Sequence, residues 1–251
     1  MTGADNPGTT GGAGRSLAGS IRRRQAEGHM PVLSEIKVRS PKEGDLLRGR
    51  APEDLAAVMV TTPIAGLSVV TDLIHFGGDT DIIRTVRPLV PVPILRKDFT
   101  ARERDLDETV DCGADAILIT VCFLDDEPLA RLCAAAGERG LETLVEVHDD
   151  KDIARVANLG LRPDVLGVNN RNIQIGETDD GDVSLTERLV PALPPGSVLL
   201  SESAISGPDD ARRARAAGAD AVLVGTSILQ AADPAEAIRA LAGVGWRQIR
   251  S

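Results

Sequence analysis

Two lysines stand at points where an apolar stretch of the sequence ends. Lys37 closes the run VLSEIK, Lys97 closes the run VPILRK, and both are followed by loop-type residues. An ammonium group is costly to place beside a buried strand unless something there uses its charge. Its usual uses are to donate a proton or to hold an anion. Glu146 and Glu202 end two further apolar stretches and supply the opposite charge, so these four groups predict a reaction centre.

Within this set, Lys97 and Glu146 have the chemistry of a proton-transfer pair. Partial burial lowers the pKa of a lysine and raises that of a glutamate, which moves both toward neutrality, where acid–base catalysis is efficient. A structural salt bridge is the alternative. Asn169 and Arg171, in the run VNNRN, add a neutral and a cationic donor. Arg171 either binds a substrate carboxylate or covers the rim of the fold.

The elements that must position these residues alternate regularly between strand-like and helix-like patterns. The apolar segments predict strands at Val32–Lys37, Gly66–Val70, Pro93–Arg96, Ala116–Val121, Thr143–Val147, Val165–Asn169, Val198–Ser201 and Ala221–Gly225. The segments between them, rich in Ala, Arg and Glu, predict helices at Pro52–Val60, Asp79–Val86, Ala101–Cys112, Glu127–Arg139, Asp150–Leu159, Leu185–Val190, Pro208–Ala217 and Pro234–Leu241. Several begin with Pro or Asp and end before Gly, as helices do.

Eight strand–helix alternations predict an α/β fold, a single (β/α)8 TIM barrel, for which 251 residues is a suitable length. An open doubly wound sheet is the alternative, but no Gly-x-Gly-x-x-Gly follows the first strand. Residues 1–14, rich in Gly and Thr, predict a disordered tail, and Leu17–Ala26 predicts a short N-terminal helical extension. Residues 15–251 would then form one catalytic domain.

The barrel explains why the scattered polar residues belong together. The carboxyl ends of all eight strands meet at one mouth, where active sites lie, and the loops after strands seven and eight commonly bind phosphate there. The turns SESAISG at 201–207 and LVGTS at 223–227 occupy these two positions. Backbone N–H groups and a helix N-terminus favour an oxyanion at such turns, and glycine permits close approach.

Composition excludes several other classes of function. A formal net charge of −10 argues against binding to nucleic acid or to an anionic membrane, and no apolar run is long enough to cross a bilayer. Three cysteines without metal-ligand spacing predict reduced, buried thiols. His29, His75 and His148 are scattered, each a surface or loop residue by expectation, so we predict no metal. We expect a soluble, cytoplasmic protein.

A series of short motifs resembles one known family, indole-3-glycerol phosphate synthase. The motifs, in family order between about Leu17 and Leu241, are EIK-x-x-SP, SVVT, FGG, LRKDF, LVEVH, GVNNR, SES and LVGTS. The resemblance implies a phosphate-binding TIM barrel without a cofactor. It also implies conversion of 1-(2-carboxyphenylamino)-1-deoxyribulose 5-phosphate to indole-3-glycerol phosphate, carbon dioxide and water in tryptophan biosynthesis.

The same resemblance assigns catalytic roles. It implies that Lys97 is the general acid on the ribulose carbonyl, that Glu146 assists the later dehydration together with Lys37, and that Glu35 belongs to the same polar cluster. Decarboxylative ring closure needs an acid on the carbonyl, a fixed ring face and anchored anions at both ends of the substrate, and these residue types are suited to supply them.

Substrate-binding residues are implied in four groups. The phosphate would be held by Ser40, Ser203 and the backbone at Ala204, Gly225 and Thr226; the hydroxyl and carboxylate side by Asn169 and Arg171; the polar centre by Glu202; and the aromatic ring by Phe76, Phe99 and Leu118. The implied partner is a small phosphorylated substrate, with neither nucleic acid nor membrane. A monomer is expected, with contacts to other enzymes of the pathway as an open alternative.

The sequence departs from the family pattern in several places. Ala204 stands where the family usually has glycine, the charged run RERDL follows Phe99 where a Tyr-Gln-Ile helix start is usual, and the N-terminal extension is short. Two other functions therefore stay open. One is a paralogous lyase that acts on a substituted anthranilate adduct in specialised metabolism, and the other is a non-catalytic barrel that binds a phosphorylated metabolite.

Overall fold

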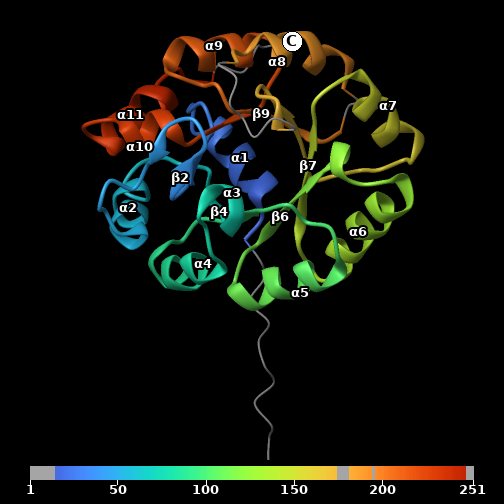
Figure 1. Ribbon diagram of the computed structural model, residues 1–251. Coiled ribbons are helices and arrows are strands. Elements are labelled where there is room, and N and C mark those ends of the chain that lie inside the picture. The colour runs from blue at the N-terminus through green and yellow to red at the C-terminus, as the bar shows by residue number, and fades with distance from the viewer. Residues whose placement is uncertain (1–14, 174–180, 194–195, 247–251) are drawn as a thin grey trace, which may run out of the picture.

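Eight parallel strands close into a barrel that is surrounded by helices (Figure 1). The computed structural model describes residues 15–173, 181–193 and 196–246. The barrel strands are β1 (Val32–Ile36), β4 (Gly66–Val70), β5 (Ile94–Lys97), β6 (Ala116–Thr120), β7 (Glu142–Val147), β8 (Val165–Asn169), β9 (Val198–Glu202) and β10 (Ala221–Val224). Each pairs with its neighbour along the chain, and β1 pairs with β10 to close the sheet. The predicted (β/α)8 barrel is confirmed.

The outer helices follow the strands in the predicted order. They are α2 (Pro52–Met59), α4 (Thr80–Val86), α5 (Glu103–Cys112), α6 (Asp126–Glu138), α7 (Asp150–Asn158), α8 (Ser184–Leu189), α9 (Pro208–Ala216) and α11 (Pro234–Ala242). Their buried faces pack on the outside of the barrel in two apolar clusters built almost wholly from aliphatic side chains. A parallel sheet is buried on both faces, so its strands consist mainly of Val, Ile and Leu. A chain with few aromatic residues can therefore still build a large core.

Helix α1 (Leu17–Ala26) covers the end of the barrel where the strands begin. Leu17 and Ile21 are fully buried and belong to the apolar cluster that fills the barrel interior. Glu142, the first residue of β7, accepts hydrogen bonds from the backbone N–H groups of Leu17 and Ala18 at 2.5 and 3.0 Å. The predicted N-terminal helical extension is therefore confirmed, and it lies opposite the carboxyl ends of the strands. The predicted tail, residues 1–14, lies outside the described residues.

Several short elements at the carboxyl ends of the strands were absent from the sequence prediction. A small hairpin, β2 (Arg39–Ser40) with β3 (Gly44–Asp45), follows β1, and the short helices α3 (Leu73–Phe76) and α10 (Thr226–Gln230) follow β4 and β10. Two-residue strands and helices of four or five residues show no recognisable periodicity. Within the three described ranges, no helix is both long and apolar enough to cross a lipid bilayer.

Candidate active site

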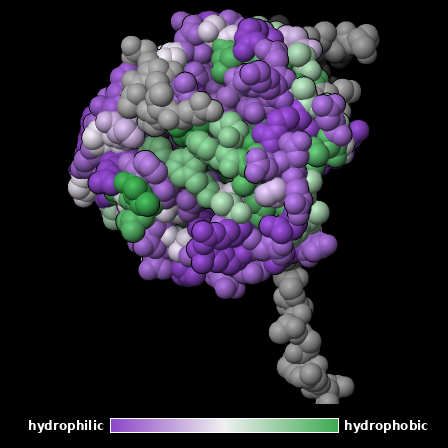
Figure 2. All heavy atoms as spheres, turned by 45° about the vertical axis from the view of Figure 1, so that its right-hand side comes forward, coloured by the Kyte–Doolittle hydropathy of each residue, from purple (hydrophilic) through white to green (hydrophobic). Residues whose placement is uncertain are grey.

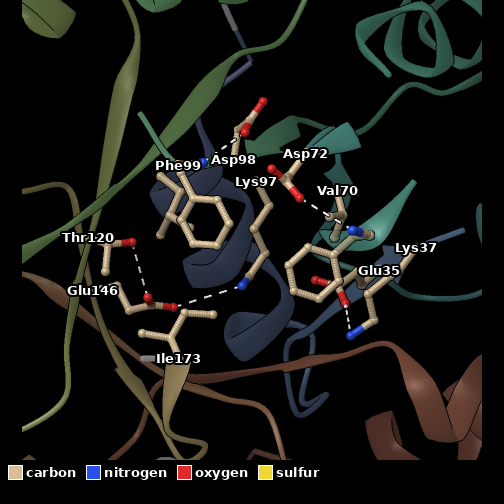
Figure 3. Close-up of a pocket in the computed structure, with 12 residues that line it drawn as sticks. Glu35, Lys37, Val70, Asp72, Lys97, Asp98, Phe99, Thr120, Glu146 and Ile173 are labelled. Atoms are coloured by element: carbon tan, nitrogen blue, oxygen red, sulfur yellow. Dashed lines mark hydrogen bonds and ion pairs between the residues drawn. The ribbon is translucent and has the colours of Figure 1, made fainter. Parts of the chain in front are cut away.

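Lys97 and Glu146 face each other across the mouth of the barrel (Figure 3). The Nζ atom of Lys97, at the end of β5, lies 3.9 Å from Oε2 of Glu146, which projects from β7 and is 1% exposed. Thr120 at the end of β6 donates a hydrogen bond to Oε1 of Glu146 at 3.2 Å, and the Asn169 amide donates to Oε2 at 3.0 Å. The glutamate carboxylate is therefore held in one orientation, with one oxygen toward the lysine.

A second buried pair lies beside the first. Lys37 Nζ is 3.4 Å from Oε1 of Glu35 and 5.6 Å from the centroid of the Phe76 ring. Ser68 on β4 donates to the other oxygen of Glu35 at 3.4 Å. A Cβ atom at Gly225 would come within 2.5 Å of the Glu35 carboxylate, so glycine at the end of β10 leaves the space that this side chain occupies.

An apolar pocket adjoins both pairs. Its aromatic walls are Phe76 and Phe99, whose ring centroids are 6.4 Å apart, and Leu118 also lines it. Figure 2 shows a hollow on one face of the molecule where apolar side chains gather inside a hydrophilic rim. The cavity volume of this pocket is only about 20 Å³.

A second, more polar cavity lies on the other side of Glu35 and Lys37, which line both spaces. The volume of this second cavity is about 380 Å³. The other residues that matter for its chemistry are Lys42, Arg171, Ser203, Ala204, Gly225, Thr226 and Ser227. The turns after β9 and β10 thus meet in one cavity, as the sequence predicted, and Arg171 lies on their side rather than beside the aromatic pocket.

The turn after β9 has left-handed backbone at two consecutive non-glycine residues. Ser203 has φ 62° and Ala204 has φ 55°. Alanine in this region is strained because its Cβ approaches the following carbonyl oxygen, whereas glycine adopts it freely. The turn therefore has the conformation that favours glycine, although alanine occupies it. This strain lies in the wall of the polar cavity.

Three of the predicted binding residues do not line either cavity. Asn169 and Glu202 are fully buried, and Ser40 is 3% exposed, its hydroxyl accepting the backbone N–H groups of Lys42 and Glu43. Within the described part of the chain, neither carboxylate oxygen of Glu202 accepts a hydrogen bond. Complete burial raises the pKa of Glu202, and the charge of Glu146 raises it further, to about 8. Glu202 thus lies behind the surface that a ligand would touch.

The structure also gathers three residues that sequence reasoning left apart. His148, in the loop after β7, has a side chain only 15% exposed, with Cys122 and Asp152 beside it. His148 is a loop residue, as expected, but most of its side chain is buried rather than on the surface. Burial alone lowers the pKa of His148, but hydrogen bonds with Asp152 and Cys122 and the charge of Glu146 outweigh it and raise this pKa to about 10. The sequence did contain one signal for this cluster. Because β6 and β7 follow one another and pair, the segments after them, which carry Cys122 and His148, lie side by side.

Comparison with known proteins identifies the group to which this sequence is related. The model of the indole-3-glycerol phosphate synthase family matches residues 11–241. The chain belongs to this family. An indole-3-glycerol phosphate synthase of Thermococcus kodakarensis is 40% identical over 230 residues, which cover 91% of this chain and 97% of that protein. Its counterpart from Pyrococcus furiosus is also 40% identical, over 89% and 95% of the two chains.

A third member of the indole-3-glycerol phosphate synthase family, from a Nocardioides species, is 41% identical over 85% of this chain and 80% of its own. Solved structures of other enzymes share only the fold. A 3-hexulose-6-phosphate synthase from Salmonella typhimurium superimposes with a TM-score of 0.66 at 18% identity, over 86% of this chain and 98% of its own. An orotidine 5′-phosphate decarboxylase from Pyrococcus horikoshii gives 0.61 at 19% identity, over 84% and 97%.

Proposed function

We propose that this chain catalyses the decarboxylating ring closure of 1-(2-carboxyphenylamino)-1-deoxyribulose 5-phosphate, with release of carbon dioxide and water, in tryptophan biosynthesis. The observation that carries this proposal is the junction of two unlike cavities at Glu35 and Lys37. One is apolar and contains the Lys97–Glu146 pair, and the other is polar and is lined by the turns after β9 and β10. The substrate has the same division, with an aryl group at one end and a phosphate at the other.

The ring-closing step needs an acid at the ribulose carbonyl. As the ring carbon that bears the carboxylate attacks the carbonyl carbon, negative charge develops on the carbonyl oxygen, and Lys97 is the ammonium group placed inside the apolar pocket to protonate it. Loss of carbon dioxide then returns the electron pair to the ring. A cation in a site with little water stabilises the developing charge far more than it would in bulk water.

The later loss of water needs a base that removes a proton and an acid that protonates the departing hydroxyl. Glu146 takes a proton from the carbon beside the ring nitrogen, a double bond forms between this carbon and the neighbouring carbinol carbon, and Lys37 protonates the hydroxyl that leaves as water. The hydrogen bonds from Thr120 and Asn169 fix the Glu146 carboxylate, which reduces the entropy lost on reaching this geometry. The Glu35 carboxylate lies 3.4 Å from Lys37 Nζ at the shared edge of the two cavities and holds the ammonium group there.

Anchoring groups at the two ends support the same function. Phe76 and Phe99 offer faces for the aryl ring, and Lys97 lines the same pocket. At the other end, Ser203, Thr226 and Arg171 line the polar cavity, and α10 begins there with the N–H groups of its first turn. An arginine and a helix N-terminus are suited to a phosphate dianion.

The experiment is a turnover assay with the purified chain. The plain carboxyphenylamino substrate should give the fluorescence of an indole product, and ring-substituted adducts should be turned over more slowly. A strong preference for a substituted adduct would favour the paralogous lyase instead. Binding of the plain substrate without any product would point to a non-catalytic barrel and contradict the proposal.

A further inference from the structure

The cluster beside Glu146 brings a thiol, an imidazole and a carboxylate to one point. Cys122 Sγ lies 3.8 Å from Nδ1 of His148, and Oδ2 of Asp152 lies 3.8 Å from the same ring nitrogen. The three atoms are all within 4.8 Å of one another. Around a tetrahedral Zn²⁺ ion, sulfur, nitrogen and oxygen ligands would be about 3.3–3.6 Å apart, given bond lengths of about 2.0–2.3 Å. The two separations from His148 Nδ1 need to contract by only a few tenths of an ångström to reach this geometry.

The arrangement differs from that of a cysteine nucleophile with its base. In a nucleophile–histidine–carboxylate triad, the nucleophile and the carboxylate bind opposite nitrogens of the imidazole ring. Cys122 and Glu146 do lie at opposite nitrogens of the His148 ring, but here a further carboxylate, that of Asp152, shares Nδ1 with Cys122. Two acidic groups that converge on one ring nitrogen surround a position for a cation, and cysteine, histidine and aspartate are all zinc ligands.

A carboxylate lies on the opposite side of the imidazole, just beyond hydrogen-bond distance, and no described residue hydrogen-bonds the ring nitrogen there. Nε2 of His148 is buried and lies 3.6 Å from Oε1 of Glu146. Metal-bound histidines commonly donate their second ring N–H to a carboxylate, which fixes the ring orientation and makes the ligand more basic. Asp152 is oriented independently, because its Oδ2 atom accepts the backbone N–H of His148 at 2.9 Å.

The cluster is reachable from solvent, and the arginine that lines the same groove is paired elsewhere. Cys122 lines an open groove together with Asp125, Asp126 and Arg155. The Arg155 guanidinium is paired with the Asp126 carboxylate at 2.7 Å and with the carbonyl oxygens of Val121 and Leu124 at 2.9 and 2.5 Å. A water molecule from the groove can therefore complete a fourth coordination position.

We propose that Cys122, His148 and Asp152 form a binding site for a single Zn²⁺ ion at the rim of the barrel. The site is separate from the two cavities assigned to the substrate, because none of its three residues lines either of them. It is connected to them through Glu146, whose carboxylate lies between His148 and Lys97. A bound ion fixes the His148 ring against this carboxylate.

The test uses untagged, chelator-treated protein titrated with Co²⁺, which reports thiolate coordination by a charge-transfer band in the near ultraviolet. The wild type should develop this band with one equivalent of metal, and Zn²⁺ should abolish it. Cys122→Ser should remove the band, and Asp152→Asn, which keeps an acceptor for the His148 N–H, should weaken binding at least about tenfold. Cys133→Ala is the matched control, because Cys133 lies in α6, outside the cluster, and its band should match that of the wild type.

Three outcomes would overturn the proposal. They are no band in the wild type, a band that persists in Cys122→Ser, and a band lost equally in Cys133→Ala. Alkylation supplies a readout that does not depend on spectroscopy, since Zn²⁺ should slow modification of Cys122 in the folded protein by about tenfold or more and leave modification of Cys133 unchanged. Equal protection of both thiols would also contradict the site.

Discussion

Lys97 Nζ lies 3.9 Å from Oε2 of Glu146, although the two side chains come from strands that are not neighbours. Strand β6 separates them, and its Thr120 hydroxyl bonds the other oxygen of the same carboxylate. The separation exceeds that of a direct hydrogen bond. The two groups therefore attract one another electrostatically, and both line the apolar pocket in which a ligand would lie.

Replacement of Lys97 by methionine should lower turnover by about 10²–10⁴-fold, because the acid at the carbonyl is removed while the length of the side chain is kept. Substrate KM should change much less than kcat. The measurement is product fluorescence against substrate concentration, with circular dichroism to verify folding. Lys151→Met, at an exposed position of α7, is the control and should behave as the wild type. Near-normal turnover by the Lys97 variant would remove this residue from the mechanism.

Ala204→Gly should stabilise the protein by about 1 kcal/mol, because glycine relieves the strain of an alanine at φ 55°. The same turn lines the polar cavity, so inhibition by inorganic phosphate should be retained or strengthened. Urea unfolding measures the first effect and steady-state inhibition the second. Ala134→Gly makes the same chemical change on an exposed position inside α6 and should destabilise by about 1 kcal/mol. Equal effects of the two substitutions would show that the turn is not strained.

The barrel and the composition of its mouth could be predicted from the sequence because both depend on local patterns. Apolar runs mark the strands, and the carboxyl ends of parallel strands must meet at one end, which brings Lys97 and Glu146 together. The sequence could not predict how deeply Asn169 and Glu202 are buried, because depth depends on how the inward side chains of all eight strands share the interior. The Cys122–His148 contact spans 26 residues and has no local spacing rule.

Stability should fall as pH rises through the range in which Glu202 titrates. Its pKa in the folded protein is about 8, against an ordinary value of 4.5, so the folded state binds this proton more tightly than the unfolded state. The resulting stabilisation is complete below about pH 4.5 and is lost as the pH approaches 8. Within this window the folding equilibrium constant should decrease by up to about tenfold per pH unit from this group alone.

Glu202→Gln isolates this contribution, because glutamine does not titrate. The difference in unfolding free energy between the wild type and this variant, measured by urea unfolding at several pH values, should move in favour of the variant as the pH rises from 5 to 8. Glu138→Gln, at an exposed position on α6, provides a control whose difference from the wild type should stay nearly constant. A flat difference for Glu202→Gln would mean that the carboxyl is ionised throughout.

Ile21→Ala should lower the free energy of unfolding by about 2–5 kcal/mol and leave the chemistry of the folded molecules intact. Ile21 is fully buried in the interior cluster beneath the barrel, whereas Lys97 and Glu146 lie at the opposite ends of the strands. The measurements are urea unfolding and kcat at a temperature where both proteins are folded. Val110→Ala, at a position 44% exposed on α5, should change stability by about 0.5 kcal/mol or less. A loss of kcat in folded Ile21→Ala would instead show that α1 helps to position the residues at the mouth.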